Sequence, residues 1–330
     1  MKTLINKIAL NGAMLALTIL TPFFTPLLAG GPTLKTFRIP TANSQPRDIT
    51  LGSDGNMWFT ESEFNVSQIG RIDSRGNITE FAVPTQNSQP SDIVAGADGA
   101  LWFTEPSGFP FGIGRITTDG TFTEYGLDLN TCSPCSLTPT GIAATPDGNI
   151  WFTESNRNAI GKLEPATGAF TFYDLPTLGS GPSGITLGPD GALWFTEFQA
   201  NQIGRIDTAG NITEFGTAIG PDNITTGPDG NLWFTEPFNN KIGRITLAGV
   251  ITEFALSFPA QPRDIVAGPD GNLWFTQYGA DQLASITPEG VVTVIQKVRG
   301  GPWGIGQGAG NTIWLTVFDG NKIARFSVGP

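Results

Sequence analysis

Side chains that could contact a ligand recur at one place in a phrase that the chain repeats seven times. The phrase reads QPRDI, QPSDI, TPTGI, GPSGI, GPDNI, QPRDI and GPWGI. We call the residue after its proline position x. In chain order, position x holds Arg47, Ser91, Thr140, Ser183, Asp222, Arg263 and Trp303. Because the rest of each unit repeats, these departures from uniformity are the first clue to a site.

A second position, fourteen residues after x, carries a carboxylate in five units. Its residues are Glu61, Glu105, Glu154, Glu197, Glu236, Gln277 and Val317. Five carboxylates around one opening would make an electronegative mouth suited to a cation or a metal-bound ligand. In the structural alternative, each glutamate accepts backbone hydrogen bonds or pairs with a basic residue of the repeated IGR and IGK phrases.

Units six, seven and one depart from this pattern together. They place Arg263, Trp303 and Arg47 at position x, and units six and seven lack the glutamate. An aromatic face flanked by two guanidinium groups could hold an anionic or sugar-like ligand. In the structural alternative, the tryptophan fills the channel and the arginines pair with carboxylates such as Asp48 or Asp264.

Tryptophans spaced 39 to 49 residues apart identify the elements that position these side chains. A repeat of this length is typical of a four-stranded propeller blade. In the fifth unit, the runs DNITT, NLWFTE, NKIGRIT and ITEFAL read as four strands, with Asp229-Gly230 as a tight turn between the first two. Alternation along W-F-T-E predicts that Trp and Phe pack on opposite neighbouring blades. Because the first two strands form a hairpin, both positions described above should face one mouth of the central channel.

The two ends of the chain are expected to complete the ring. After Trp314 the chain supplies one more strand, NKIARFSV, and the missing outer strand matches LKTFRIP at residues 34–40. Pairing these segments in one blade would remove an exposed edge and close the ring. The sequence therefore predicts an all-β, seven-bladed propeller that forms a single domain over residues 31–330.

The first thirty residues are typical of a secretory signal peptide. Lys2 and Lys7 precede an apolar run that ends in small residues near Ala29. Pro22 and Pro26 interrupt that run before it reaches the ~20 apolar residues of a spanning helix. We therefore expect a secreted or periplasmic protein that is free of the membrane after signal cleavage. The formal charge of −11 argues against a nucleic-acid partner, and we expect a monomer.

The two cysteines form a single C-x-x-C pair, Cys132 and Cys135, in an insertion that opens the third unit. One such pair cannot supply four tetrahedral zinc ligands in a chain without histidine. A thiol oxidoreductase would place the motif on a βαβ unit, and no such pattern is visible. In an exported protein, a local disulfide is the expected state.

The phrase GPDGNLWFTE at 227–236, together with NKIGRI and P-x-G-I, resembles the virginiamycin B lyase (streptogramin B lyase) family over residues 34–330. The resemblance implies a seven-bladed propeller that opens a cyclic depsipeptide antibiotic by elimination at an ester linkage, with magnesium in the site. It also implies histidines at position x of the last two blades, and metal-binding glutamates two residues before and fourteen after x of the last blade. Those four places hold Trp303, Arg263, Gly301 and Val317.

This departure from the family pattern is chemical. Elimination needs a group that accepts a proton near neutral pH, whereas arginine stays protonated and tryptophan has no basic nitrogen. Gly301 and Val317 offer no side-chain oxygen to magnesium, and no other unit has two carboxylates at the corresponding places. Magnesium is therefore implied by the resemblance alone, and the residues themselves indicate no cofactor.

Three functional hypotheses follow from these residues. The first is a binding or interaction module for a small molecule, glycan or protein, with Arg47, Arg263, Trp303 and Asp222 toward the ligand and the five glutamates opposite. The second is a carbon–oxygen lyase of the streptogramin B type, or another metal-assisted enzyme, that uses the glutamates at the channel mouth. The third is a structural surface protein without a ligand, because a fold alone does not fix a function.

Overall fold

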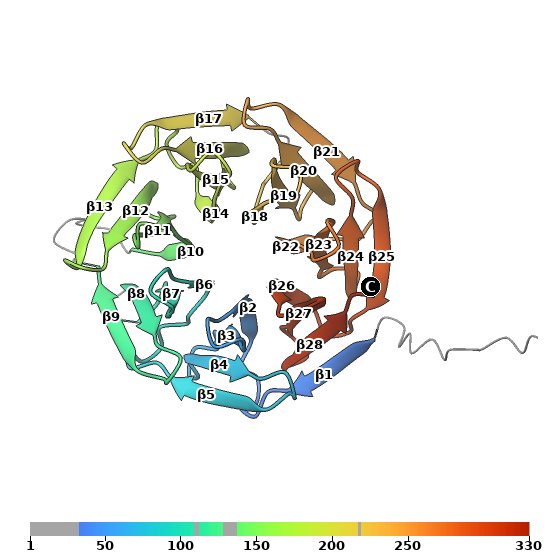
Figure 1. The fold of residues 1–330 in the computed structure, drawn as a ribbon. Coiled ribbons are helices and arrows are strands. Elements are labelled where there is room, and N and C mark those ends of the chain that lie inside the picture. Colours follow the sequence, from blue (N-terminus) through green and yellow to red (C-terminus); the bar gives the residue numbers. More distant parts are fainter. Residues whose placement is uncertain (1–32, 109–111, 128–136, 217–218, 330) are drawn as a thin grey trace, which may run out of the picture. The chain divides into compact units, whose positions relative to one another are not determined.

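The computed structural model describes residues 33–108, 112–127, 137–216 and 219–329. Within these ranges the chain forms 28 strands in seven four-stranded antiparallel sheets, which surround a common axis (Figure 1). The predicted seven-bladed propeller is thus confirmed. None of the described residues belongs to a helix long and apolar enough to cross a membrane. The expected leader and the Cys132–Cys135 pair lie outside the described residues.

Each blade is built from strands that are consecutive in the sequence, except the last. Blades one and two consist of β2 (Pro46–Leu51), β3 (Met57–Glu61), β4 (Gln68–Ile72) and β5 (Ile78–Ala82), then β6 (Ile93–Ala95), β7 (Leu101–Glu105), β8 (Gly112–Ile116) and β9 (Phe122–Gly126). Blades three and four consist of β10 (Pro139–Ala144), β11 (Ile150–Glu154), β12 (Ala159–Glu164) and β13 (Ala169–Asp174), then β14 (Pro182–Leu187), β15 (Leu193–Glu197), β16 (Gln202–Ile206) and β17 (Ile212–Gly216). Blades five and six consist of β18 (Ile224–Thr226), β19 (Leu232–Glu236), β20 (Lys241–Ile245) and β21 (Ile251–Ala255), then β22 (Pro262–Ala267), β23 (Leu273–Gln277), β24 (Gln282–Ile286) and β25 (Val292–Lys297). Blade seven combines β26 (Pro302–Gly308), β27 (Thr312–Val317) and β28 (Lys322–Ser327) with β1 (Leu34–Arg38) from the other end of the chain.

Ring closure occurs through the strand that the sequence predicted. β1 pairs antiparallel with β28, with Phe37 opposite Ile323. The ring of Phe37 stacks on Trp314 at a centroid distance of 5.9 Å, and Ile39 is fully buried just beyond the strand. The N-terminal strand therefore supplies both the outer edge and part of the core of blade seven.

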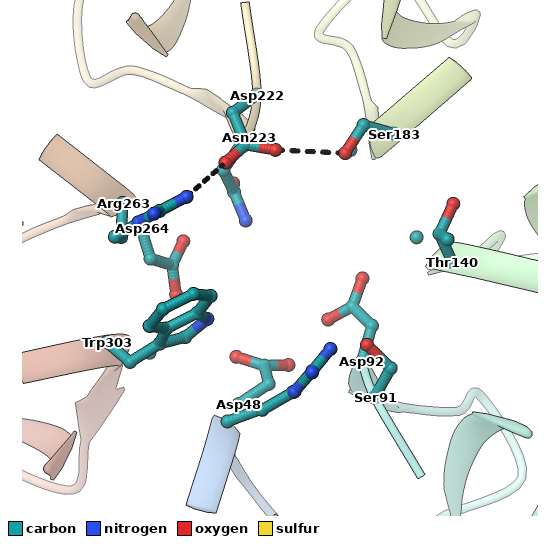
Figure 2. Close-up of a pocket in the computed structure, with 14 residues that line it drawn as sticks. Asp48, Ser91, Asp92, Thr140, Ser183, Asp222, Asn223, Arg263, Asp264 and Trp303 are labelled. Carbon is teal, nitrogen blue, oxygen red and sulfur yellow. Dashed lines mark hydrogen bonds and ion pairs between the residues drawn. The ribbon is translucent and has the colours of Figure 1, made fainter. Parts of the chain in front are cut away.

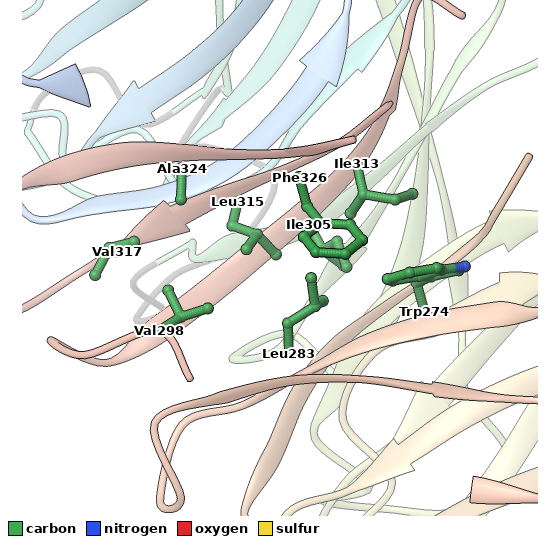
Figure 3. Close-up of a cluster of buried hydrophobic side chains, with 9 residues drawn as sticks. All are labelled: Trp274, Leu283, Val298, Ile305, Ile313, Leu315, Val317, Ala324 and Phe326. Carbon is green, nitrogen blue, oxygen red and sulfur yellow. The ribbon is translucent and has the colours of Figure 1, made fainter. Parts of the chain in front are cut away.

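The W-F alternation joins each blade to both of its neighbours. Trp58 packs with Leu101 and Phe103 of blade two. Phe59 on the same strand packs with Trp314 of blade seven, as the sequence predicted. The same contacts recur between blades six and seven, where Trp274 joins a buried apolar cluster with Leu315 and Phe326 (Figure 3).

Glycine in the IGR phrase is explained by the phenylalanine of the neighbouring strand. A Cβ atom at Gly70 would lie only 2.1 Å from the ring of Phe59. Glycine therefore allows the ring to lie flat against the backbone of the third strand.

Aspartates of the predicted Asp-Gly turns bind the tryptophans. Nε1 of Trp58 donates a hydrogen bond to Oδ1 of Asp54 at 3.1 Å, and blades two, four, five and six repeat this bond. Gly55 adopts a φ of 76°, which a glycine tolerates without steric cost. The aspartates thus serve the turn and the core, in line with the turn role expected from the sequence.

The threonine of W-F-T-E joins adjacent blades next to the channel. Oγ1 of Thr60 accepts a hydrogen bond from the amide of Asp48 at 3.1 Å and donates one to the carbonyl oxygen of Ser91 in the next blade at 2.9 Å. All seven blades make this pair of bonds, which we call the threonine link. The last link runs from Thr316 to the carbonyl of Arg47 at 2.7 Å and joins blade seven to blade one.

Replacing Thr316 by valine is expected to lower the free energy of unfolding by about 2 kcal/mol. Valine keeps the shape, but the buried amide of Gly304 and the carbonyl of Arg47 then lose their partner, and an unsatisfied buried group costs about 1–3 kcal/mol. Urea unfolding followed by tryptophan fluorescence measures the change. Thr79→Val, at an exposed threonine of β5, is the matched control, and an equal effect of both substitutions would contradict the proposed link.

Candidate functional site

One end of the central channel opens into a pocket of about 200 Å³. All seven residues at position x line this pocket, together with the seven residues that follow them (Figure 2). The sequence prediction that position x faces one mouth of the channel is therefore confirmed. We call this space the mouth pocket.

Irregular strand pairing brings two successive residues of each phrase to the mouth pocket. In blade one, Pro46 lies opposite Glu61 and Ile49 opposite Phe59, with a register shift between the two pairs. Blades three, four, six and seven show the same shift, whereas β6 and β18 begin only after position x. A regular strand points successive side chains to opposite faces, and the irregularity relaxes this rule.

Arg263 and Trp303 form a stacked pair on one side of the mouth pocket. The guanidinium carbon of Arg263 lies 4.4 Å from the centroid of the Trp303 ring. Nη1 of Arg263 lies 3.7 Å from Oδ2 of Asp222, and Oδ1 of Asp222 accepts a hydrogen bond from the hydroxyl of Ser183 (Figure 2). The partner of Arg263 is thus Asp222 rather than Asp264, which the structural alternative had named.

Two further aromatic rings support Trp303. Tyr278 meets it edge-on at a centroid distance of 5.4 Å, and the ring of Phe318 lies 5.0 Å away. Both residues directly follow the second strand of their blade, where blades one and three have serine, blades two and five have proline, and blade four has Phe198. We call Trp303, Tyr278 and Phe318 the aromatic wall. The sequence contains this signal, but contact with Trp303 appears only in the structure.

Arg47 completes the arc expected from the sequence, since β26 of blade seven contacts both β22 and β2. Within the described residues, Arg47 has no ion-pair partner, and its buried Nε atom has no hydrogen-bond partner. Burial, and then the nearby guanidinium of Arg263, lower the pKa of Arg47. Two like charges therefore line the same pocket and repel each other.

Three aspartates next to position x were missed as pocket residues. Each carboxylate accepts a hydrogen bond from a backbone amide of the next blade: Asp48 from Ile93, Asp92 from Ile142, and Asp264 from Ile305. Burial, with the neighbouring Asp48, raises the pKa values of Asp92 and Asp264 well above their usual range. We call these aspartates the channel triad. The repeated R-D and S-D pairs of the phrase were the available signal.

The five glutamates lie beside the mouth pocket rather than in it. Glu61, Glu105, Glu154, Glu197 and Glu236 are no more than 1% exposed, and none of them lines the pocket. Both faces of the W-F-T-E strand point to neighbouring blades, and Glu lies on the face of Phe, so its side chain is buried between blades. The expected electronegative ring of glutamates is therefore not what the mouth presents.

Burial changes the acidity of these glutamates. Burial and then Glu80 raise the pKa of Glu61 to about 8, against a smaller lowering by the side chain of Ser44. Burial likewise raises the pKa of Glu105 to about 8 and of the other three to about 7. Glu154 differs from Glu61 because its Oε1 accepts the amide hydrogen of Thr138 at 2.6 Å. The buried glutamates can exchange protons near neutral pH, but they do not reach the pocket.

The places that the family resemblance assigns to magnesium ligands do not fit the ion. Val317 is fully buried in the apolar cluster with Leu315 and Val298 (Figure 3), and Gly301 has no side chain. Magnesium requires oxygen ligands, which neither residue offers from its side chain. Among the described residues, no three His, Cys, Asp or Glu side chains are grouped so that they could hold a metal ion.

Comparison with known proteins places this propeller among characterised relatives. The virginiamycin B lyase family model matches residues 27–218 and again residues 135–329. A streptogramin B lyase structure is 39% identical, with a TM-score of 0.82, and the match covers 91% of this chain and 98% of that one. No curated protein was matched.

Two structures of virginiamycin B lyase from Staphylococcus aureus are also similar. Each is 40% identical, with a TM-score of 0.82 over 90% of this chain and all of the other. One of them is a catalytically inactive histidine-to-alanine variant with quinupristin. Since the family model spans most of the sequence and these structures share the whole ring, the chain belongs to the virginiamycin B lyase family.

Proposed function

We propose that this protein is an exported binding module on a lyase-type propeller, and that it takes its ligand in the mouth pocket without performing the lyase reaction. The observation that carries this proposal is the composition of the pocket. Its non-repeating residues, Arg47, Arg263 and Trp303, converge on one arc of the mouth. A concave site with a few convergent polar groups is the usual form of a small-molecule site.

The acid–base inventory of the pocket argues against elimination. The basic groups that line it are guanidiniums, which do not accept protons near neutral pH. The carboxylates of the channel triad are engaged with backbone amides of neighbouring blades, and the fourth carboxylate of the pocket, Asp222, is engaged with Arg263 and Ser183. The inactive variant of the staphylococcal relative is a histidine replacement, and this chain contains no histidine.

The volume of the mouth pocket limits the size of the proposed ligand. At about 200 Å³ it is smaller than the ~300–1,000 Å³ of typical sites for drug-sized ligands. A small molecule, or a single terminal group of a larger one, is therefore the proposed ligand. The leader-like first thirty residues are the basis for proposing that the module works outside the cytoplasm.

Incubation with quinupristin and magnesium tests the catalytic half of the proposal. We expect quinupristin to remain intact by mass spectrometry under conditions in which the staphylococcal virginiamycin B lyase consumes it. The expected difference is at least about a thousand-fold, since loss of a general base alone costs about 10²–10⁴ in rate. A linear product at a rate comparable to the relative would establish the second hypothesis, a lyase.

Saturation-transfer NMR with three ring-bearing probes tests the binding half. Benzoate, benzamide and benzylammonium are similar in shape and differ in charge. At least one is therefore expected to bind, whether the natural ligand is negative, neutral or positive. Ser91→Trp, which fills the mouth pocket from blade two, should abolish the signal. Ser74→Trp, at an exposed turn of blade one, should leave it unchanged. Signals that are absent for all probes, or that persist in Ser91→Trp, contradict a binding module at the mouth.

A further inference from the structure

We propose that the ligand of the mouth pocket is a small organic carboxylate with an unsaturated ring, held by Arg47 and Arg263 beside the aromatic wall. This inference rests on the proposed function, because it names the chemistry of the ligand for the same pocket. It depends on three features: an unpaired guanidinium, a second guanidinium that is only partly engaged, and a set of acidic groups whose hydrogen bonds are directed elsewhere.

The first feature is the unpaired charge on Arg47. A largely buried guanidinium without a partner is costly, and the usual remedy is a hydrogen-bonded counter-charge. Arg47 lies in the mouth pocket, yet it forms no ion pair with any described residue. Its planar fork of N–H donors matches a carboxylate, which can accept two parallel hydrogen bonds. A bound carboxylate would therefore complete an interaction that the described protein groups leave open.

The second feature is the position of Arg263. Its contact with Asp222 is 3.7 Å long, beyond the ~2.7–2.9 Å of a charge-assisted hydrogen bond, and its buried Nε has no partner. Both guanidiniums line the mouth pocket, and the charge of Arg263 lowers the pKa of Arg47. An anion between the two would reduce their repulsion and gain attraction from both. Blades six and one thus supply a clamp on either side of blade seven.

The third feature is the state of the channel triad, whose carboxylates would otherwise repel an anion. Asp48, Asp92 and Asp264 direct oxygens to backbone amides of the next blade rather than to the arginines. Burial raises the pKa values of Asp92 and Asp264, so that their neutral forms are favoured and less negative charge opposes an anion. The triad therefore does not take the place of the missing partner of Arg47.

The aromatic wall determines where the rest of the ligand lies. Trp303 is the aromatic residue that lines the pocket, and Tyr278 and Phe318 hold it from behind, whereas position x of blades two to four carries only short polar side chains. Aromatic rings attract other rings in stacked or edge-on contacts worth about 0.5–1.5 kcal/mol. In the small mouth pocket, one ring beside the arginines is the ligand that uses both the charge and the apolar surface.

Binding constants for benzoate, benzamide, benzylammonium and acetate test this inference. We expect benzoate to bind about ten-fold more tightly than benzamide. Added salt should weaken the binding of benzoate but not that of benzamide. Arg47→Gln should weaken the binding of benzoate about ten-fold and change the binding of benzamide by no more than about two-fold. Arg47→Lys keeps the charge but loses the planar fork of N–H donors. Its affinity for benzoate should lie between those of the unchanged protein and of Arg47→Gln. Arg75→Gln, at an exposed turn of blade one, is the matched control and should change nothing.

The possible outcomes separate this inference from the proposed function. If benzamide or benzylammonium binds at the mouth as tightly as benzoate, the carboxylate specificity is wrong while the binding module stands. If acetate binds as tightly as benzoate, and Trp303→Leu leaves benzoate binding unchanged, the ring requirement is wrong. If no probe binds in a manner sensitive to Ser91→Trp, both the inference and the binding module fail. The thermal midpoint of each variant shows whether a lost signal reflects unfolding.

Discussion

Deletion of residues 1–39 is expected to abolish cooperative folding, whereas deletion of residues 1–31 should leave the propeller intact. The longer deletion removes β1, and with it the partner of β28, the stacking of Phe37 on Trp314 and the buried side chain of Ile39. Burial of each large apolar side chain stabilises by about 1.5–3 kcal/mol. The loss is thus comparable with the ~5–15 kcal/mol of a whole domain.

Circular dichroism melting and size-exclusion chromatography measure this effect. Without β1, the unpaired edge of β28 is open to strands from other copies, so we expect loss of the sharp transition together with aggregation. Phe37→Ala in the full chain should lower the free energy of unfolding by about 3 kcal/mol, which separates the packing of one ring from the whole strand. Equal melting of the two deletions would mean that β1 does not close the ring.

A shift from pH 5 to pH 9 is expected to destabilise the protein by several kcal/mol, because the buried glutamates must then carry charge. Burial and the nearby Glu80 raise the pKa of Glu61 from 4.5 to about 8 in the folded state. A raised folded-state pKa contributes stability that is complete below about pH 4.5 and is lost as the pH rises through about 8. Each pKa unit corresponds to about 1.4 kcal/mol, and five such glutamates act in the same direction.

Urea unfolding at a series of pH values tests this dependence. Glu61→Gln should flatten the curve by about 4 kcal/mol between pH 5 and pH 9, because the amide cannot ionise. Glu105→Gln should behave in the same way, since burial also raises the pKa of Glu105 to about 8. Glu289→Gln, at an exposed turn, is the matched control. A stability that stays constant between pH 5 and pH 9 would show that these glutamates are already ionised in the folded state at pH 5.

The fold could be predicted because its information is local and repeated. The tryptophan spacing, the Asp-Gly turns and the W-F alternation each determine a feature within one unit, and Trp58 and Phe59 contact opposite neighbours as expected. Ring closure required only that residues 34–40 match a missing fourth strand. These patterns depend on short-range geometry, which is what a sequence shows most directly.

The site was only half predictable, for two geometric reasons. Position x was identified because it opens a strand, but the aspartates beside it were missed because regular alternation would turn Asp48 away from position x, and the repeated R-D and S-D pairs do not reveal the register shift. The glutamates were placed at the mouth because the end of the second strand lies beside position x. Glu61 instead shares a face with Phe59, which packs against blade seven, so its side chain is buried between blades.

The threonine links also bear on the electrostatics of the channel. Every Thr hydroxyl donates from its own blade to the following one, so the seven O–H dipoles circulate in one rotational sense around the axis. Vectors arranged tangentially around a closed circle nearly cancel, so the repeated scaffold adds little field along the channel. The electrostatic potential at the mouth is therefore governed by the residues that break the repeat. The side chains of Arg47 and Arg263 can be replaced without changing the threonine links, which use only the backbone of these residues.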